Sequence, residues 1–162
     1  MSGRLLLLSV RPRFAALILA GTKTIELRRV RPRVDPGDGV LLYVSSPVMA
    51  LMAYSTVERV FEGSPAKLWE QVRSRAGVTR REYDEYFRGA ARGVGIVLGA
   101  LDRFSRAVPL SELRERWPGF HPPQSFRYLD SQAFEDMAVL TQNVARAPVS
   151  STIALMSCPT SS

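Results

Sequence analysis

The chain has 162 residues, 46% of them hydrophobic, and a formal net charge of +7. This length and apolar content are typical of a single domain with its own core. Cys158 is the single cysteine and His121 the single histidine, which excludes a disulfide within the chain and a zinc site built from Cys and His ligands. We therefore expect no metal and no cofactor, and a cytoplasmic protein.

The first predicted elements are a strand and a short helix. Leu5 to Val10 form a continuous apolar run, which is typical of a buried strand. The run is followed at once by Arg11 and is too short for a signal peptide or a membrane span, so we expect no membrane contact. Pro12 suits the first position of a helix and Gly21 the position after its end, which predicts a helix over residues 13–20.

The pattern changes to alternation over residues 24–28. Ile25 and Leu27 are predicted to face the core, which places Glu26 and Arg28 together on the opposite face, close to Lys23. A carboxylate and two cations in this arrangement have two interpretations. They form either a surface ion pair or part of a binding site for a charged ligand.

The middle of the chain alternates between strand and helix patterns. Alternation falters near Tyr54, which predicts a β-bulge there. Ser64 suits an N-cap, and Thr79 with Glu82 has the spacing of a capping box, so each is expected to open a helix. We expect strands over residues 40–45, 48–62 and 93–104, and helices over residues 64–77, 79–89 and 111–117.

The positive charge is concentrated at the start of the chain. Residues 1–34 contain eight Lys and Arg residues and one acid, whereas the remaining residues carry fourteen of each sign. A localised basic field attracts anions such as phosphate, although arginines at strand edges also guard against aggregation. We favour the interpretation that this region faces phosphate.

The segment over residues 120–129 combines aromatic and polar side chains. Gln124, Ser125, Arg127 and Tyr128 offer amide, hydroxyl, guanidinium and phenol groups beside Phe126. This mixture suits recognition of a planar, hydrogen-bonding ligand such as a nucleobase. It also suits a segment whose aromatic residues close one end of the fold, and the sequence leaves the two interpretations open.

Composition changes again after Asp136, where Ser, Thr, Ala and Pro dominate and only one charged residue, Arg146, follows. No periodicity is evident there. We expect residues 1–136 to form the domain and residues 137–162 to form a C-terminal extension that either lies on the surface or is flexible.

Several of these segments together resemble a known family. The pieces are SVRP at residues 9–12, AGTKTIELRR at residues 20–29, the SPAKLWEQ and TRREYDEYF helices, and PPQSFRYL at residues 122–129. The sequence is similar to the ASCH (activating signal cointegrator homology) domain, a branch of the PUA-like fold, from Leu5 to about Leu129. The pattern G-x-K-T-x-E-x-R is the most specific part of the match.

The resemblance implies an α+β fold, a PUA-like β-barrel with short helices packed around it and a cleft at one mouth. It implies an RNA-binding or nucleotide-binding protein linked to transcription or translation, with RNA or a nucleotide-like ligand as partner. Tyr128 or Phe126 is expected to stack on a base there. The expected binding residues, from the motif and from the patterns above, are Arg11, Lys23, Thr24, Glu26, Arg28, Ser45, Gln124, Ser125, Arg127 and Tyr128.

Two enzymatic alternatives stay open, with Lys23 and Glu26 as candidate catalytic residues. One ASCH branch resembles an amidohydrolase that removes the acetyl group of N4-acetylcytidine with a Thr nucleophile, a Lys and a Glu. Here Lys23 matches, but Glu26 stands where that branch has Thr, which counts against this activity. Hydrolysis of RNA is the other alternative, with Glu26 as general base, a cation to stabilise the phosphate and His121 as a candidate acid.

Overall fold

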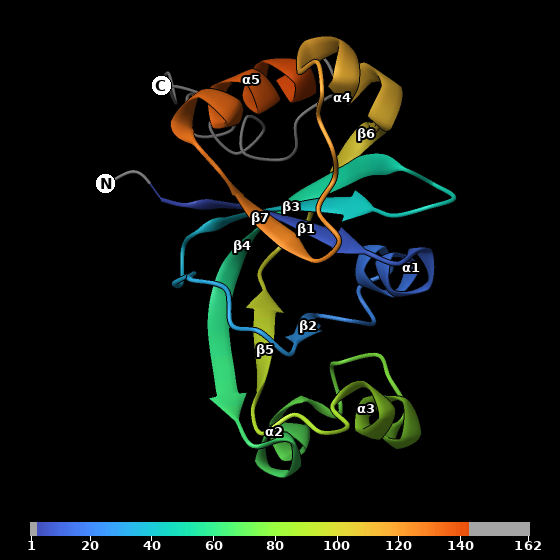
Figure 1. The fold of residues 1–162 in the computed structure, drawn as a ribbon, viewed down its shortest axis with the longest axis vertical. Helices are drawn as coiled ribbons and strands as arrows, with labels where there is room; N and C mark the ends of the chain where they lie inside the picture. The colour runs from blue at the N-terminus through green and yellow to red at the C-terminus, as the bar shows by residue number, and fades with distance from the viewer. Residues whose placement is uncertain (1–2, 143–162) are drawn as a thin grey trace, which may run out of the picture.

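The protein, described by a computed structural model over residues 3–142, has a mixed α+β fold (Figure 1). This confirms the predicted class. In the described range the strands are β1 (Leu5–Val10), β2 (Ile25–Arg28), β3 (Gly39–Val44), β4 (Ala50–Gly63), β5 (Gly93–Leu98), β6 (Asp102–Pro109) and β7 (Phe126–Leu129). The helices are α1 (Pro12–Leu19), α2 (Pro65–Val72), α3 (Arg80–Tyr86), α4 (Leu110–Arg116) and α5 (Ser131–Gln142).

One sheet joins all of these strands. They pair in the order β2-β5-β4-β3-β1-β7, and β6 pairs with β4 beside this path. The β1–β3 pair is parallel and the others are antiparallel. The path is open, with β2 at one end and β7 at the other, so the predicted closure into a barrel is not confirmed.

Helices cover the sheet in separate groups (Figure 1). At one end α4 and α5 pack on β1 and β3, around buried residues that include Leu7, Tyr43 and Leu113. At the other end α2 and α3 pack on β2 and β5, around residues that include Ile25 and Tyr83. A third cluster lies inside the curved sheet and under α1. Both faces of the central strands are therefore buried, as their continuous apolar runs indicate.

The long predicted strand over residues 93–104 is wrong, because the structure divides it into β5 and β6. β5 pairs with the second half of β4, from Val57 to Gly63, and β6 pairs with the first half, from Ala50 to Tyr54. The chain between β5 and β6 therefore cannot continue as one strand paired with β4. The register of β4 shifts between Leu51 and Ala53 and again between Val57 and Arg59, close to the bulge predicted near Tyr54.

Both predicted helix caps of α2 and α3 are confirmed. The Ser64 hydroxyl accepts a hydrogen bond from the Lys67 amide, and Thr79 and Glu82 form the complete capping box. However, α2 ends at Val72 and not at residue 77. The segment that follows α2 instead contacts the start of β2, where the Arg75 carbonyl accepts hydrogen bonds from the amides of Thr24 and Ile25.

The C-terminal part of the described chain is helical across the expected boundary at residue 136. Helix α5 runs from Ser131 to Gln142, and Met137 is 3% exposed and packs against the cluster under α4. Residues 143–162 lie outside the described residues, with the rest of the predicted extension and Cys158. Within residues 3–142, none of the helices has the length and apolar character needed to cross a membrane.

Candidate functional site

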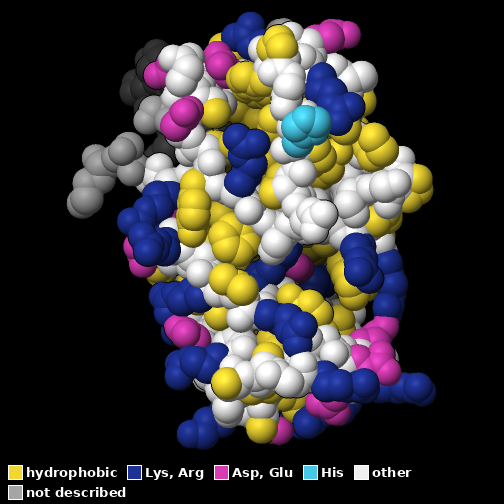
Figure 2. Space-filling model, viewed as in Figure 1, with side chains coloured by type: hydrophobic (Ala, Val, Ile, Leu, Met, Phe, Trp, Pro, Cys, Tyr) yellow, Lys and Arg dark blue, Asp and Glu magenta, His cyan; other side chains and the backbone are white. Residues whose placement is uncertain are grey.

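A cavity of about 340 Å³ opens between β2, α1, α3 and the loop before β7. Figure 2 shows the hollow near the middle of this face, where basic and acidic side chains lie among hydrophobic ones. Its volume is at the lower end of the range for small-molecule sites, about 300–1,000 Å³. The lining residues are Ser9, Val10, Arg11, Phe14, Lys23, Glu26, Leu27, Arg28, Val78, Glu82, Tyr83, Tyr86, Gln124 and Ser125.

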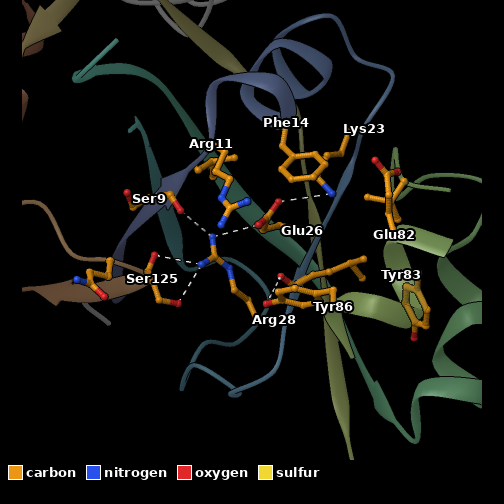
Figure 3. Close-up of a pocket in the computed structure, with 14 residues that line it drawn as sticks. Ser9, Arg11, Phe14, Lys23, Glu26, Arg28, Glu82, Tyr83, Tyr86 and Ser125 are labelled. Atoms are coloured by element: carbon orange, nitrogen blue, oxygen red, sulfur yellow. Dashed lines mark hydrogen bonds and ion pairs between the residues drawn. The ribbon is translucent and has the colours of Figure 1, made fainter. Parts of the chain in front are cut away.

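Three charged side chains, Lys23, Glu26 and Arg28, lie buried at this cavity and are called the triad below. Their exposures are 3%, 7% and 7%. Arg28 Nη2 lies 3.1 Å from Glu26 Oε1, and Lys23 Nζ lies 3.6 Å from Glu26 Oε2 (Figure 3). The prediction that Glu26 and Arg28 share one face of the strand is confirmed, but the surface ion pair is wrong. The face of β2 that carries Glu26 and Arg28 is covered too, because Ser125 of the loop before β7 contacts Arg28 and Phe14 of α1 lies beside Lys23.

Arg28 joins the two ends of the sheet through its side chain. Its Nη1 donates to Ser125 Oγ at 2.9 Å and to the Ser125 carbonyl at 3.2 Å, and its Nη2 donates to the Ser9 carbonyl at 3.1 Å. Ser9 and Ser125 are themselves joined by a backbone hydrogen bond of 3.0 Å. The Arg28 guanidinium thus connects β2 to β1 and to the loop before β7. These three segments line one side of the cavity.

Lys23 is held by the segment that follows α2. Its Nζ donates to the Ala76 carbonyl at 2.6 Å and lies 5.4 Å from the centre of the Phe14 ring. Gly77 has a φ of +64°, and a Cβ at this position would lie 3.0 Å from Lys23 Cβ. Burial lowers the pKa of Lys23, and the Glu26 carboxylate partly opposes this effect.

Two polar atoms of the triad keep unused hydrogen-bonding capacity. Glu26 Oε2 and Arg28 Nε are buried and have no hydrogen-bond partner among the described residues. Buried polar groups are normally satisfied, because an unmade hydrogen bond costs roughly 1–3 kcal/mol. Such atoms beside a cavity are typical of a site that completes its hydrogen bonds with a ligand.

The rim of the cavity carries further charge. Arg11 is exposed, and Figure 3 shows it pointing toward Arg28 and Glu26. No side-chain hydrogen bond or ion pair joins Arg11 to the rest of residues 3–142. Across the opening, Glu82 pairs with Arg13 and accepts from the Thr79 amide. The Arg13 guanidinium and this amide lower the pKa of Glu82 to about 2.

Aromatic side chains form the wall opposite the loop before β7. Phe14 comes from α1, and Tyr83 and Tyr86 come from α3. Tyr83 is buried and donates to the Pro65 carbonyl at 2.7 Å, and burial raises its pKa to about 12. Tyr86 is 41% exposed and donates to the Leu27 carbonyl at 3.4 Å. Tyr86 is therefore the more accessible of the two tyrosine rings.

The structure brings six of the ten sequence-predicted binding residues together. Arg11, Lys23, Glu26, Arg28, Gln124 and Ser125 line the cavity.

The other four predicted residues lie outside the cavity lining. Thr24 accepts a hydrogen bond from Arg75 Nε at 2.9 Å, and Ser45 follows β3 and donates its amide to the Val10 carbonyl. Arg127 lies over the Phe120 ring, and the Tyr128 hydroxyl accepts from the Arg33 amide. Phe126 packs against the core under α1 and also does not line the cavity.

Sequence reasoning missed the other eight lining residues. Tyr83 packs in the cluster under α2 and α3, and both Tyr83 and Tyr86 reach the cavity from α3. Phe14 packs against the core under α1 and also lines the cavity. Ser9 contributes through its carbonyl, which no side-chain pattern predicts. The capping-box pattern predicted that Glu82 helps to begin α3, but it did not indicate that Glu82 also lines the cavity.

Among residues 3–142, His, Cys, Asp and Glu side chains form no group of three or more that is suited to a metal ion.

Comparisons with known proteins agree on one family. The model of the ASCH domain matches residues 8–117. A curated relative from Zymomonas mobilis, named ASCH domain-containing ribonuclease, is 28% identical over 137 residues, covering 85% of this chain and 92% of the relative. The crystal structure of ASCH from Zymomonas mobilis superposes with a TM-score of 0.79 at 27% identity, covering 85% and 95% of the two chains.

A more distant solved structure shares the fold alone. The human THYN1 protein, solved in complex with DNA that contains 5-methylcytosine, has a TM-score of 0.56 at 12% identity. The match covers 86% of this chain and 98% of that one.

Proposed function

This chain belongs to the ASCH domain family, and from that premise we propose that it binds single-stranded RNA, with one nucleotide seated in the cavity at the triad. The observation that carries the proposal is the buried triad itself, two cations around one carboxylate at the floor of a small cavity. Burying such charges is costly, and two of their polar atoms, buried beside a cavity in the size range of small-molecule sites, have no hydrogen-bond partner among residues 3–142.

The cavity offers a complement for each part of a nucleotide. The uncompensated Arg11 at the rim suits a phosphate, and α1 begins beside it with no acid in its first turn. Phe14 and Tyr86 present ring surfaces on which a base can pack. Glu26 Oε2 and the Gln124 amide suit the hydrogen-bonding edge of the base.

The relatives also support a nucleic-acid ligand. The Zymomonas mobilis relative is named a ribonuclease, and the human neighbour was crystallised on DNA. The expected link to transcription or translation stays a prediction.

Arg11 provides the most direct test, because it is exposed and its replacement leaves the core intact. We expect Arg11→Gln to weaken binding of a single-stranded RNA octamer by about three- to tenfold and to reduce the salt slope of log K by about 0.7. Fluorescence anisotropy at two salt concentrations measures both. Arg103→Gln, an exposed change of the same charge on β6, is the matched control. Equal affinities and slopes in the two variants would contradict the proposal.

Cleavage of the bound RNA is a second candidate function. The lowered pKa of Lys23 beside Glu26 favours it, together with the name of the relative. Glu26 would accept the proton of a ribose 2′-hydroxyl, whose oxygen attacks the neighbouring phosphorus. Lys23 would give a proton to the departing 5′-oxygen, and Arg28 would stabilise the charged phosphorane. The products are a 2′,3′-cyclic phosphate and a 5′-hydroxyl end.

Mass spectrometry of RNA incubated with the protein separates this candidate from binding alone. We expect fragments with a cyclic phosphate end, which disappear in Glu26→Gln. Intact RNA at saturating wild-type protein would reject cleavage and leave the binding proposal standing. Deacetylation of N4-acetylcytidine is not proposed, because the hydroxyl of Thr24 is engaged by Arg75 away from the cavity lining.

A further inference from the structure

A second cavity, of about 360 Å³, lies between α5, β7 and the loop that follows α4. Trp117 and Phe120 from the loop, Arg127 from β7 and Asp136 from α5 contribute to its wall. None of these residues belongs to the first cavity. Its lining combines aromatic rings with groups of both charges, a composition that suits a nucleotide more than a purely apolar ligand.

Arg127 supplies a positive charge that has no ion-pair partner among the described residues. The side chain is exposed, and its guanidinium lies 5.6 Å from the centre of the Phe120 ring. Its one hydrogen bond, to the His121 carbonyl, is 3.5 Å long, and no carboxylate within residues 3–142 forms an ion pair with it. A guanidinium in this state is free to bind phosphate.

Trp117 supplies a fixed ring. Its Nε1 donates to Asp136 Oδ2 at 3.1 Å, and Asp136 Oδ1 also accepts from Arg116 and Gln132 at 3.3 Å. These bonds hold the half-buried indole in place and neutralise the carboxylate, whose pKa they lower. The other acid of the cavity, Asp130, caps α5 through the Ala133 amide at 2.8 Å. Neither carboxylate is paired with Arg127.

The two cavities share one stretch of chain. The loop between α4 and β7 contributes Phe120 to the second cavity and Gln124 with Ser125 to the first. Figure 1 shows this loop passing from α4 to the start of β7 beside β1. Ser125 lies just before β7 and Arg127 lies within it, two residues further along the chain. A strand of RNA that follows this stretch of chain would pass from the first cavity to the second.

We propose that the second cavity binds the next nucleotide of the same RNA strand. Arg127 holds the phosphate that links the two nucleotides, and the Trp117 ring stacks on the second base. This inference rests on the proposed RNA binding and extends it, because it makes the ligand a strand and not a free nucleotide.

The test compares the affinities for ligands of different lengths in wild-type protein and three variants. Wild-type protein, Arg127→Gln and the control Arg103→Gln are titrated with nucleoside monophosphates and with single-stranded RNA of two, four and eight nucleotides. We expect wild-type affinity to rise at least about fivefold from the monophosphate to the dinucleotide. Arg127→Gln should remove most of this gain, lower the salt slope by about 0.7, and leave monophosphate binding unchanged. Trp117→Leu should reduce the same gain.

The outcomes separate the two proposals. If wild type binds monophosphate and octamer equally well, or if Arg127→Gln matches Arg103→Gln on every RNA, the second site is wrong and the first stands. If wild type binds none of the ligands, both proposals fail. The Trp117→Leu result counts only if the unfolding midpoint of this variant matches that of wild type. If the midpoints differ, Arg127→Gln alone tests the second site.

Discussion

Strands β2 and β3 are both buried along their whole length, but they are built from different residues. β3 consists of GVLLYV, and its burial contributes hydrophobic stabilisation of roughly 1.5–3 kcal/mol for each large side chain. β2 buries Ile25 and Leu27 in the same way on one face, yet carries Glu26 and Arg28 on the other. Removing these charges from water is costly, and their attraction only offsets that cost. Strand β3 therefore maintains the fold, whereas the charged face of β2 is the part for which we propose ligand binding.

The largest expected effect comes from removing the carboxylate of the triad. In Glu26→Ala two buried cations, Lys23 and Arg28, lose their counter-charge, so the free energy of unfolding should fall by about 3–5 kcal/mol. Urea denaturation measures this loss of unfolding free energy. Leu42→Ala in β3 is the matched comparison, with an expected loss of about 2–4 kcal/mol from the cavity it leaves and with RNA affinity unchanged. A Glu26→Ala protein as stable as wild type would show that the three charges are not coupled.

A smaller effect is expected from the glycine beside Lys23. Gly77→Ala forces an alanine into φ +64° and places its Cβ 3.0 Å from Lys23 Cβ. The backbone strain should cost about 1–2 kcal/mol of unfolding free energy. Displacement of Lys23 should also weaken RNA binding in the titration described above.

Gly89→Ala separates these two contributions. Gly89 has a φ of +76°, but a Cβ there meets no atom within 4 Å. Gly89→Ala should therefore lower the free energy of unfolding without weakening RNA binding. Equal RNA affinities in the two variants would mean that Gly77 does not position Lys23.

The smallest effect concerns the rim pair between Arg13 and Glu82. The pKa of Glu82 is about 2 in the folded protein and its ordinary value is 4.5, so the folded state favours the ionised form. The stabilisation it contributes is complete above pH 4.5 and is lost as the pH falls toward 2. The difference in urea midpoint between wild type and Glu82→Gln should thus favour wild type at pH 6 and shrink by pH 3. A constant difference over this range would contradict the assignment.

Local rules in the sequence were sufficient for most elements. Pro12, Ser64 and the Thr79–Glu82 capping box begin the helices where predicted, because an N-cap depends on neighbouring residues alone. The alternation over residues 24–28 correctly put Glu26 and Arg28 on one face. The split between β5 and β6 was missed, because it depends on which half of β4 each segment pairs with. Pairing over such distances leaves no trace in a short stretch of sequence.

The sequence by itself determined the family, the α+β class and the charged motif that lines the cavity. Only the tertiary structure decided that the triad is buried, because the exposure of one strand face depends on what packs over it, here α1 and the loop before β7. It also decided that Tyr86 and Phe14 reach the same cavity and that Arg127 faces another. These residues are distant along the chain, and the open end of the sheet, bridged by Arg28, brings Ser9 and Ser125 together with them.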